Sequence, residues 1–291
     1  MKNIIVMSGD IGSGKSSVAT ALQQLTGFDI IGTGTIQRAI ATRRGLTTLE
    51  LNKISQTDRS VDDEIDSYVV ETGQTQDRLI LDSRLAWHFI PTAFKVYLSV
   101  DSSIGAQRVF NASRDDEHNP SLAATLENNL KRQAIEDQRF QKLYNIHFRR
   151  YGNYDLIIDT SYNPPEVIAQ KIKECFDAWL NQQTFAALWL APRKLLPTRL
   201  IEPDTEADTA QQTVEVFLYN GFIYIWQGHH RVYAAHQADT PLIAAKLITE
   251  YANDELADGI RAAELAHTVS PTLLNSWETL LGFNYDSYPK I

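Results

Sequence analysis

The sequence has little of what secreted and membrane-spanning proteins need. Its 291 residues contain one cysteine, Cys175, so no disulfide can form within the chain, which suits a reducing compartment. No run of 18 apolar residues occurs, and we expect no transmembrane helix. The opening MKNIIVMSGD passes directly into a glycine loop and lacks the longer apolar stretch of a signal peptide. We therefore expect a cytoplasmic protein without a membrane partner, in which Cys175 is a small apolar residue on a helix face.

Positive charge is also scarce. The chain has 27 Lys and Arg against 36 Asp and Glu, a net charge of -9, of which residues 181–291 carry the larger part. A general nucleic-acid binder needs a basic surface, so that class is disfavoured. The length suits two domains, which we place at residues 1–180 and 195–291. Whether the protein is a homodimer stays open.

Short apolar runs alternate with helical stretches in the first domain. The runs that we expect to be strands are NIIVMSG, FDIIGTG, DRLILDS, FKVYLSV and YDLIIDT. Strands that alternate with helices predict an α/β fold, with a parallel sheet flanked by helices. Ligands of such sheets bind beyond the carboxyl ends of the strands. Residues that could bind a ligand or take part in catalysis do follow the expected strands: Gly9, Thr33, Asp82, Asp101 and Asp159.

The strongest motif is GDIGSGKS, residues 9–16, which has the P-loop spacing G-x-x-x-x-G-K-[ST] between a strand and a helix. Backbone N–H groups of such a loop surround phosphate oxygens, and the helix N-terminus adds positive potential. Lys15 can reach the β- and γ-phosphates, while the Ser16 hydroxyl can bind Mg²⁺. We therefore predict ATP and Mg²⁺ as cofactors. The ATP-binding residues that we expect in the loop are Gly9, Gly12, Ser13, Gly14, Lys15, Ser16 and Ser17.

Arginines recur after the P-loop. Arg38 follows Gly34 at the start of the second expected helix, and Arg84 follows Asp82 after the third strand. Further arginines stand on or beside later helical segments, at Arg108, Arg114, Arg132 and Arg139. Phosphoryl transfer is mostly positioning and charge stabilisation, so arginines around a P-loop favour transfer between two anionic molecules.

Residues 1 to about 175 resemble the cytidylate kinase branch of the nucleoside monophosphate kinases, especially its shorter, archaeal-type form. The matching segments, in order, are GDIGSGKSSVA, GTGTIQRAIA, DDEIDS, ILDSRLAWHFI, FKVYLSVD, RQAIEDQRFQKLY and YDLIIDTS. The resemblance implies an ATP- and Mg²⁺-dependent kinase that acts on CMP, dCMP or a similar phosphorylated acceptor. We expect nucleotides to be its main binding partners.

The same resemblance implies roles for individual residues. Lys15 and Ser16 would serve the donor triphosphate, and Asp82 would lie near the Mg²⁺ or the acceptor. The acceptor would be bound by Gly34, Arg38, Asp82 and Arg84. A closing lid that contacts phosphates would contain Arg108, Arg114, Arg132 and Arg139. The catalytic group would then be Lys15, Asp82, Arg84, Arg132 and Arg139, with Ser16 and Asp82 as metal ligands.

Two departures keep other functions open. Ser83 stands where the family usually has glycine, and three carboxylates, Asp115, Asp116 and Glu117, follow Arg114 directly in the expected lid. One alternative is a kinase of a small-molecule hydroxyl, such as a free amino acid, with Asp82 as base. Another is a non-catalytic nucleotide sensor or ATPase switch that closes on ATP.

The second domain has the pattern of a small α+β unit. VEVFLY and FIYIW are strand-like and are separated by NG, a strong hairpin signal, while RVYAAHQA favours a helix and LIAAKLI a further strand. Gly228 permits the turn into the helix, whose free N–H groups attract an anion, and Arg231 adds a forked donor. We therefore predict a second phosphate site at Gly228, His229, His230 and Arg231.

This GHHR segment resembles the G-x-x-R motif of the ParB/sulfiredoxin superfamily, and the likeness covers roughly residues 195–250. It implies that a hairpin leads into a helix whose N-terminus binds a nucleotide phosphate. A metal site is disfavoured, because His229 and His230 are adjacent and point about 100° apart on a helix. A purely structural alternative is that His229 caps the helix and His230 packs against a tryptophan.

Overall fold

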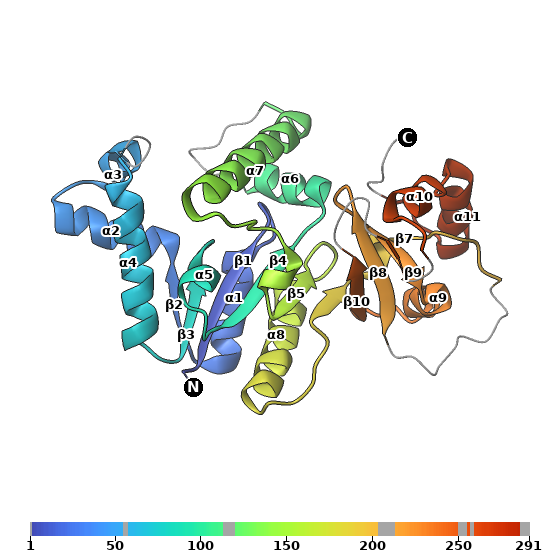
Figure 1. Ribbon diagram of the computed structural model, residues 1–291, viewed down its shortest axis with the longest axis horizontal. Helices are drawn as coiled ribbons and strands as arrows, with labels where there is room; N and C mark the ends of the chain where they lie inside the picture. The colour runs from blue at the N-terminus through green and yellow to red at the C-terminus, as the bar shows by residue number, and fades with distance from the viewer. Residues whose placement is uncertain are drawn as a thin grey trace.

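One mixed sheet of ten strands runs through the part of the chain that the computed structural model describes (Figure 1). The described residues are 2–54, 58–112, 120–202, 213–249, 255–256 and 259–285. In sheet order the strands are β2 (Asp29–Gly32), β3 (Leu79–Asp82), β1 (Ile4–Gly9), β4 (Phe94–Ser99), β5 (Leu156–Asp159), β6 (Leu188–Leu190), β10 (Ile243–Thr249), β8 (Val214–Tyr219), β9 (Phe222–Gln227) and β7 (Leu195–Leu196).

Helices lie on the faces of this sheet. The first group is α1 (Lys15–Thr26), α2 (Thr33–Arg44), α3 (Thr48–Ile54), α4 (Ser60–Thr75), α5 (Ala86–Phe89), α6 (Ser102–Asn111), α7 (Leu122–Tyr144) and α8 (Pro165–Leu180). The second group is α9 (His229–Gln237), α10 (Ala262–His267) and α11 (Pro271–Leu281). Two short 3-10 turns are η1 (Tyr151–Asn153) and η2 (Pro192–Lys194). None of the helices in the described ranges is long and apolar enough to span a bilayer.

Strands β1 to β5 are parallel and confirm the predicted α/β fold. The side chains of β1 and β5 are buried on both faces, as apolar runs such as IIVMSG require, whereas the edge strand β2 is partly exposed. Helices α1 and α8 pack together over one face, where Cys175 lies buried on α8 as expected. Residues of α2, α4 and α5 belong to the core on the other face. Because β1 is the middle one of these five strands, the loop after it opens at the middle of their carboxyl edge.

The segment between the two predicted domains is itself a strand of the sheet. β6 pairs parallel with β5 and antiparallel with β10. Leu188 and Leu190 are buried, which explains why this segment is too apolar for a free linker. The sheet therefore continues from one predicted domain into the other, and the division at residues 180 and 195 stays a proposal.

The C-terminal strands form the predicted hairpin. β8 and β9 pair antiparallel across Asn220 and Gly221, which both have positive φ (49° and 82°), as a tight hairpin turn requires. β10 runs parallel to β8, and α9 follows β9 directly. Residues of α10 and α11 pack with Phe217 and Tyr224 on one face of the strands. This arrangement confirms the helix and the three strands expected from the sequence.

Candidate active site

The P-loop connects β1 to α1 and packs tightly against α6. Gly12 has a φ of +81°, and a Cβ added there would lie 2.3 Å from the carbonyl oxygen of Gly105. The Ser13 N–H donates to the Asp10 carbonyl (3.2 Å) and closes the turn. Only glycine gives both the left-handed conformation and this backbone approach. The position of α6 is therefore coupled directly to the shape of the loop.

Lys15, Ser16 and Asp82 meet where β1 and β3 end. The half-buried Lys15 ammonium donates to the carbonyls of Gly9 (3.3 Å) and Asp10 (3.5 Å). Burial lowers the pKa of Lys15 to about 8, although the nearby carboxylate of Asp82 acts in the opposite direction. Burial also raises the pKa of Asp82, whose carboxylate accepts a hydrogen bond from the Ser16 hydroxyl. These side chains form a partly dehydrated group in which an anion would favour the charged lysine.

A cavity of about 1020 Å³ extends from this group between the P-loop, α4 and α7. The predicted residues that line it are Gly12, Ser13, Gly14, Lys15, Ser16, Ser17, Asp82, Arg84, Arg108, Arg132 and Arg139. Gly9, Gly34 and Arg38 do not line it. The Arg38 guanidinium instead donates to Thr35 Oγ1 (3.1 Å) at the surface, and Gln37 lines the cavity. Arg114, together with the acidic residues that follow it, lies outside the described residues.

Arginines converge on the middle of the cavity. Arg84 forms an ion pair with Glu136 of α7, and Arg132 Nε lies 3.3 Å from Glu136 Oε1. Burial lowers the pKa of Arg84 to about 10, and the neighbouring charges of Arg132 and Arg149 act in the same direction. Two cations thus share one carboxylate, and the middle of the cavity favours a further anion.

One end of the cavity lies at the loop after β5. Arg108 Nη2 donates to the carbonyls of Thr160 (2.7 Å) and Ser161 (3.0 Å), and its Nη1 donates to the Gly12 carbonyl (3.4 Å). Arg108 therefore ties this loop to the P-loop through backbone atoms. The resemblance implied a phosphate contact for Arg108, and the structure places its guanidinium against the protein backbone at this end.

Carboxylates that were not singled out from the sequence lie at the other end. Asp62 and Asp66 on α4 face α7, where Asp62 pairs with Arg139 and Asp66 accepts from the Tyr144 hydroxyl (2.7 Å). Burial raises the pKa of Asp66 to about 6, against the effect of the Tyr144 hydrogen bond. The four-residue spacing within DDEIDS, which places both carboxylates on one helix face, is the signal that could have found them.

A buried group behind the P-loop was also missed. Asp10 accepts from the Tyr97 hydroxyl (2.6 Å) and from the Val100 N–H (3.1 Å), and it forms an ion pair with Arg149. Arg149 also forms an ion pair with Asp137 of α7 (3.0 Å). The network fixes the loop from behind and connects it to α7, but its members are too far apart in sequence to form a motif.

The oxygen atoms at the P-loop suit Mg²⁺. Within the described ranges, no three His, Cys, Asp or Glu side chains cluster as metal ligands. Ser16 and Asp82 instead provide one hydroxyl and one carboxylate at the start of α1. Mg²⁺ prefers hard oxygen ligands and commonly takes one or two from protein, with phosphates and water completing its shell. The residues present therefore fit this ion.

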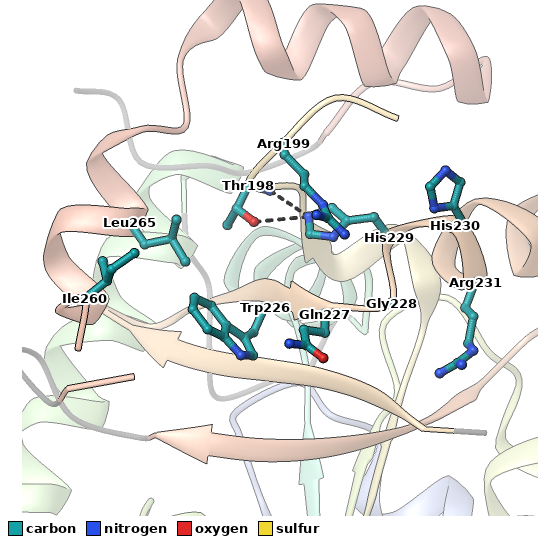
Figure 2. A pocket seen from close by; sticks show the side chains of 10 residues that line it. All are labelled: Thr198, Arg199, Trp226, Gln227, Gly228, His229, His230, Arg231, Ile260 and Leu265. Atoms are coloured by element: carbon teal, nitrogen blue, oxygen red, sulfur yellow. Dashed lines mark hydrogen bonds between the residues drawn. The ribbon is translucent and has the colours of Figure 1, made fainter. Parts of the chain in front are cut away.

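A second cavity, of about 420 Å³, lies at the start of α9 (Figure 2). Gly228 has a φ of +98° at the N-cap, and a Cβ there would lie 3.3 Å from Val214 Cγ2. His229 is buried, and its Nε2 accepts from the Thr198 N–H (3.2 Å). Its Nδ1 then carries the proton and has no hydrogen-bond partner among the described residues. This buried N–H is therefore unsatisfied within the described residues.

The arginine that lies beside His229 is not the one that the sequence indicated. Burial lowers the pKa of His229 to about 3, and Arg199 acts in the same direction, so the ring is neutral. Arg199 points toward His229 in Figure 2, whereas Arg231 extends away and donates to the Thr213 carbonyl (3.0 Å). The structural alternative that His229 caps α9 is wrong, because Gly228 occupies the N-cap position and His229 is the first residue of the helix. His229, rather than its neighbour, lies beside a tryptophan, Trp277 (6.0 Å between ring centroids).

A P-loop on a parallel sheet, an acidic residue at the end of the adjacent strand and an arginine-lined cavity define a P-loop kinase of the nucleoside monophosphate kinase type. Comparison with known proteins agrees. A family model described as an AAA domain matches residues 5–135. Cytidylate kinase from Natronomonas pharaonis is 32% identical over 178 residues, which are 60% of this chain and 90% of that protein. The chain belongs to the cytidylate kinase family.

The same region is similar to part of a longer protein. An S-adenosylmethionine-dependent nucleotide dehydratase from Lacinutrix mariniflava is 34% identical over 175 residues, 60% of this chain but 36% of that protein. Among solved structures, a shikimate kinase from Bacteroides thetaiotaomicron covers 61% of this chain and 99% of its own, with 13% identity and a TM-score of 0.46. Both sequence relatives cover 60% of this chain, so its kinase-like part is joined to a further region that they do not account for.

Proposed function

We propose that the protein transfers the γ-phosphoryl group of ATP to a nucleoside monophosphate with an amino-bearing base, CMP or dCMP. The observation that carries this proposal is that Lys15 and Arg84 both lie near Asp82 within one cavity. The lowered pKa values of both cations indicate a site that an anion stabilises. Two phosphate groups, one from each substrate, supply such anions.

The donor occupies the end formed by the P-loop and the loop after β5. P-loop N–H groups and Lys15 bind its β- and γ-phosphates. Ser16 and Asp82 would hold Mg²⁺, which would neutralise charge on the transferring phosphoryl group. The donor base lies beside Thr160 and Asn163, which line this end. Arg108 keeps the two loops at a fixed separation through its three backbone contacts.

The acceptor occupies the end between α4 and α7. Arg84 and Arg132 exchange Glu136 for the acceptor phosphate and place its oxygen in line with the γ-phosphorus. Phe89 and Tyr144, in edge contact at 5.7 Å, supply an apolar wall for the base. Asp62 and Asp66 accept hydrogen bonds from an exocyclic amine, which cytosine has and uracil lacks. The phosphate oxygen is already a nucleophile, so this transfer needs no general base.

Assays of ADP release with each common nucleoside monophosphate test this assignment. We expect CMP or dCMP to accelerate ADP release strongly and UMP to do so weakly. Stimulation by no nucleotide acceptor, but by a small-molecule alcohol or an amino acid, would favour the hydroxyl kinase, for which Asp82 is the candidate base. Tight ATP binding without turnover for any acceptor would favour the nucleotide sensor.

Residues 195–291, which we propose as a separate ParB/sulfiredoxin-like domain, contribute a second nucleotide phosphate site at the start of α9. Support comes from the left-handed Gly228, the buried His229 Nδ1–H and the neighbouring Arg199. His230 and Arg231 line the same cavity. Calorimetric titration of the Lys15→Ala variant with ATP, ADP and CTP isolates this site. Binding that Arg199→Ala abolishes supports it, and the absence of binding contradicts it.

A further inference from the structure

The loop after β5 is fixed by a carboxylate without solvent contact. Asp159 is 0% exposed, and its Oδ1 accepts from the hydroxyl (2.6 Å) and the N–H (3.3 Å) of Ser161. The carbonyls of Thr160 and Ser161 in this turn accept from Arg108, and Thr160 and Asn163 line the donor end of the cavity. The conformation of the donor-binding loop therefore depends on Asp159.

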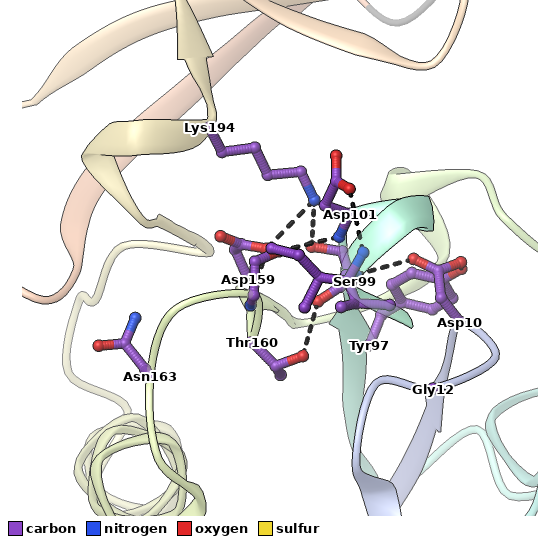
Figure 3. A network of polar contacts seen from close by, with 12 residues as sticks. Asp10, Gly12, Tyr97, Ser99, Asp101, Asp159, Thr160, Asn163 and Lys194 are labelled. Atoms are coloured by element: carbon purple, nitrogen blue, oxygen red, sulfur yellow. Dashed lines mark hydrogen bonds and ion pairs between the residues drawn. The ribbon is translucent and has the colours of Figure 1, made fainter. Parts of the chain in front are cut away.

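The cationic partner of Asp159 comes from beyond the kinase-like segment. Lys194 ends η2, and its Nζ lies 3.2 Å from Asp159 Oδ1 and 3.5 Å from Ser99 Oγ (Figure 3). The Lys194 side chain is 14% exposed. Burial acts to lower the pKa of Lys194, but Asp159 and Tyr151 outweigh this effect and raise it, so the ammonium stays charged. Loss of one partner of such a pair leaves a buried charge uncompensated.

Two further contacts connect the same loop to the C-terminal region, by which we mean the part of the chain after α8. The Arg193 guanidinium lies over the ring of Tyr162, 4.9 Å from its centroid. Asn163 Nδ2 donates to the Pro241 carbonyl (2.9 Å) in the segment before β10. The loop is thus attached to the C-terminal region at three residues, of which the Asp159 contact is the charged and most buried one.

We propose that Lys194 is a positioning residue for the donor nucleotide. By compensating Asp159, it holds the loop after β5 in the conformation that binds the donor base and anchors Arg108. Lys194 lies beyond residues 1 to about 175, the part that resembles cytidylate kinases. The C-terminal region therefore completes the donor site of this enzyme. The inference rests on the proposed donor end of the cavity and is independent of which acceptor is used.

Direct titration of the full-length protein with ATP, in the absence of acceptor, tests the proposal. Lys194→Met is expected to raise the ATP Kd about tenfold, because a small displacement of the loop misplaces the base and Arg108. The KM for CMP is expected to stay within twofold. The matched control is Lys246→Met, which removes a lysine that pairs with Glu215 (3.0 Å) in the same region but is 66% exposed. Its ATP Kd should be unchanged.

Further variants separate positioning from loss of folding. Asp159→Asn combined with Lys194→Met removes the uncompensated charge, while the oxygen of the introduced amide can still accept from Ser161. The ATP Kd of this double variant is expected to return to within threefold of the unaltered protein. If Lys194→Met alone does not fold, Arg193→Gln, which leaves the buried pair intact, should raise the ATP Kd about threefold.

Two results would overturn the proposal. One is a folded Lys194→Met protein whose ATP Kd lies within twofold of the unaltered protein. The other is an unfolded Lys194→Met protein together with an unchanged ATP Kd for Arg193→Gln. ATP binding that depends on Lys194, without phosphorylation of any nucleotide, would contradict the acceptor assignment and support the positioning role.

Discussion

Arg84 and Glu136 form an ion pair inside the main cavity, at the position where the acceptor phosphate is expected. Arg132 contacts the same carboxylate, so Glu136 is paired with two of the arginines that we assign to binding of the acceptor phosphate. A phosphate has more charge and more acceptor oxygens than a carboxylate and competes well for both guanidinium groups. Glu136 therefore stands in for the substrate anion and must be displaced when the acceptor binds.

Substitution of Glu136 and substitution of Arg84 should change the KM for CMP in opposite directions. Glu136→Gln removes the competing charge and is expected to lower the KM for CMP about threefold to tenfold. Arg84→Ala removes a charge-assisted donor and should raise it by at least about tenfold, with a lower kcat. Steady-state kinetics at saturating ATP measures both. A rise in KM for both variants would show that Glu136 assists binding instead of opposing it.

The lowered pKa of Lys15 predicts proton uptake on ATP binding. With a pKa of about 8 in the free protein, Lys15 is largely charged at pH 7 and largely neutral at pH 9. The phosphates favour the ammonium and raise this pKa, so ATP affinity is fully present below pH 8 and falls as pH rises above it. Calorimetry at pH 9 in two buffers of different ionisation enthalpy should detect uptake of nearly one proton. Uptake that persists in Lys15→Met would assign it to another group.

Asp66 should oppose folding at neutral pH. Its folded pKa of about 6 lies above the usual value of 3.8, so its contribution to stability is present below pH 3.8 and lost as pH rises through 6. Asp66→Asn removes this penalty and should raise the unfolding free energy at pH 7.5 by about 1 kcal/mol, allowing for solvent screening. It should also weaken the preference for CMP over UMP. Urea unfolding at pH 7.5 and pH 4 checks the sign, and a stabilisation larger at pH 4 would contradict this account.

The close approach of the P-loop to α6 makes Gly105 essential for ATP binding. A Cβ on Gly105 would lie 2.7 Å from the Ile11 carbonyl oxygen and push the P-loop away from α6. Gly105→Ala should therefore raise the KM for ATP at least about tenfold. Gly152→Ala is the matched control, since the nearest atom to its added Cβ is 4.0 Å away. Equal effects of both substitutions on the KM for ATP would refute the steric argument.

The fold could be predicted from the sequence because its signals are local. Apolar runs gave the strands, and the NG dipeptide gave the hairpin between β8 and β9. The P-loop was recognised from eight adjacent residues, 9–16. Continuity of the sheet through β6 could not be predicted, because strand pairing between β6 and β10 joins residues far apart in the chain.

The site could be predicted only in part, because some of its residues are far apart in the chain and meet only on folding. Residues that follow strands, such as Lys15 and Asp82, were found from their position. Pairs that form only on folding, such as Asp159 with Lys194, were not, because no spacing marks them. The same holds for the second cavity. A local motif indicated Arg231, whereas the packing of a separate segment places Arg199 beside His229.

The central claim is that the P-loop cavity transfers phosphate from ATP to CMP or dCMP. Its most direct test is incubation of the full-length protein with γ-labelled ATP, Mg²⁺ and CMP, followed by separation of the nucleotides. The account predicts that the label appears in CDP and that Lys15→Ala lowers its rate of formation by at least about a hundredfold. Label that stays in ATP or appears only as inorganic phosphate, or CDP formation that Lys15→Ala leaves unchanged, would contradict it.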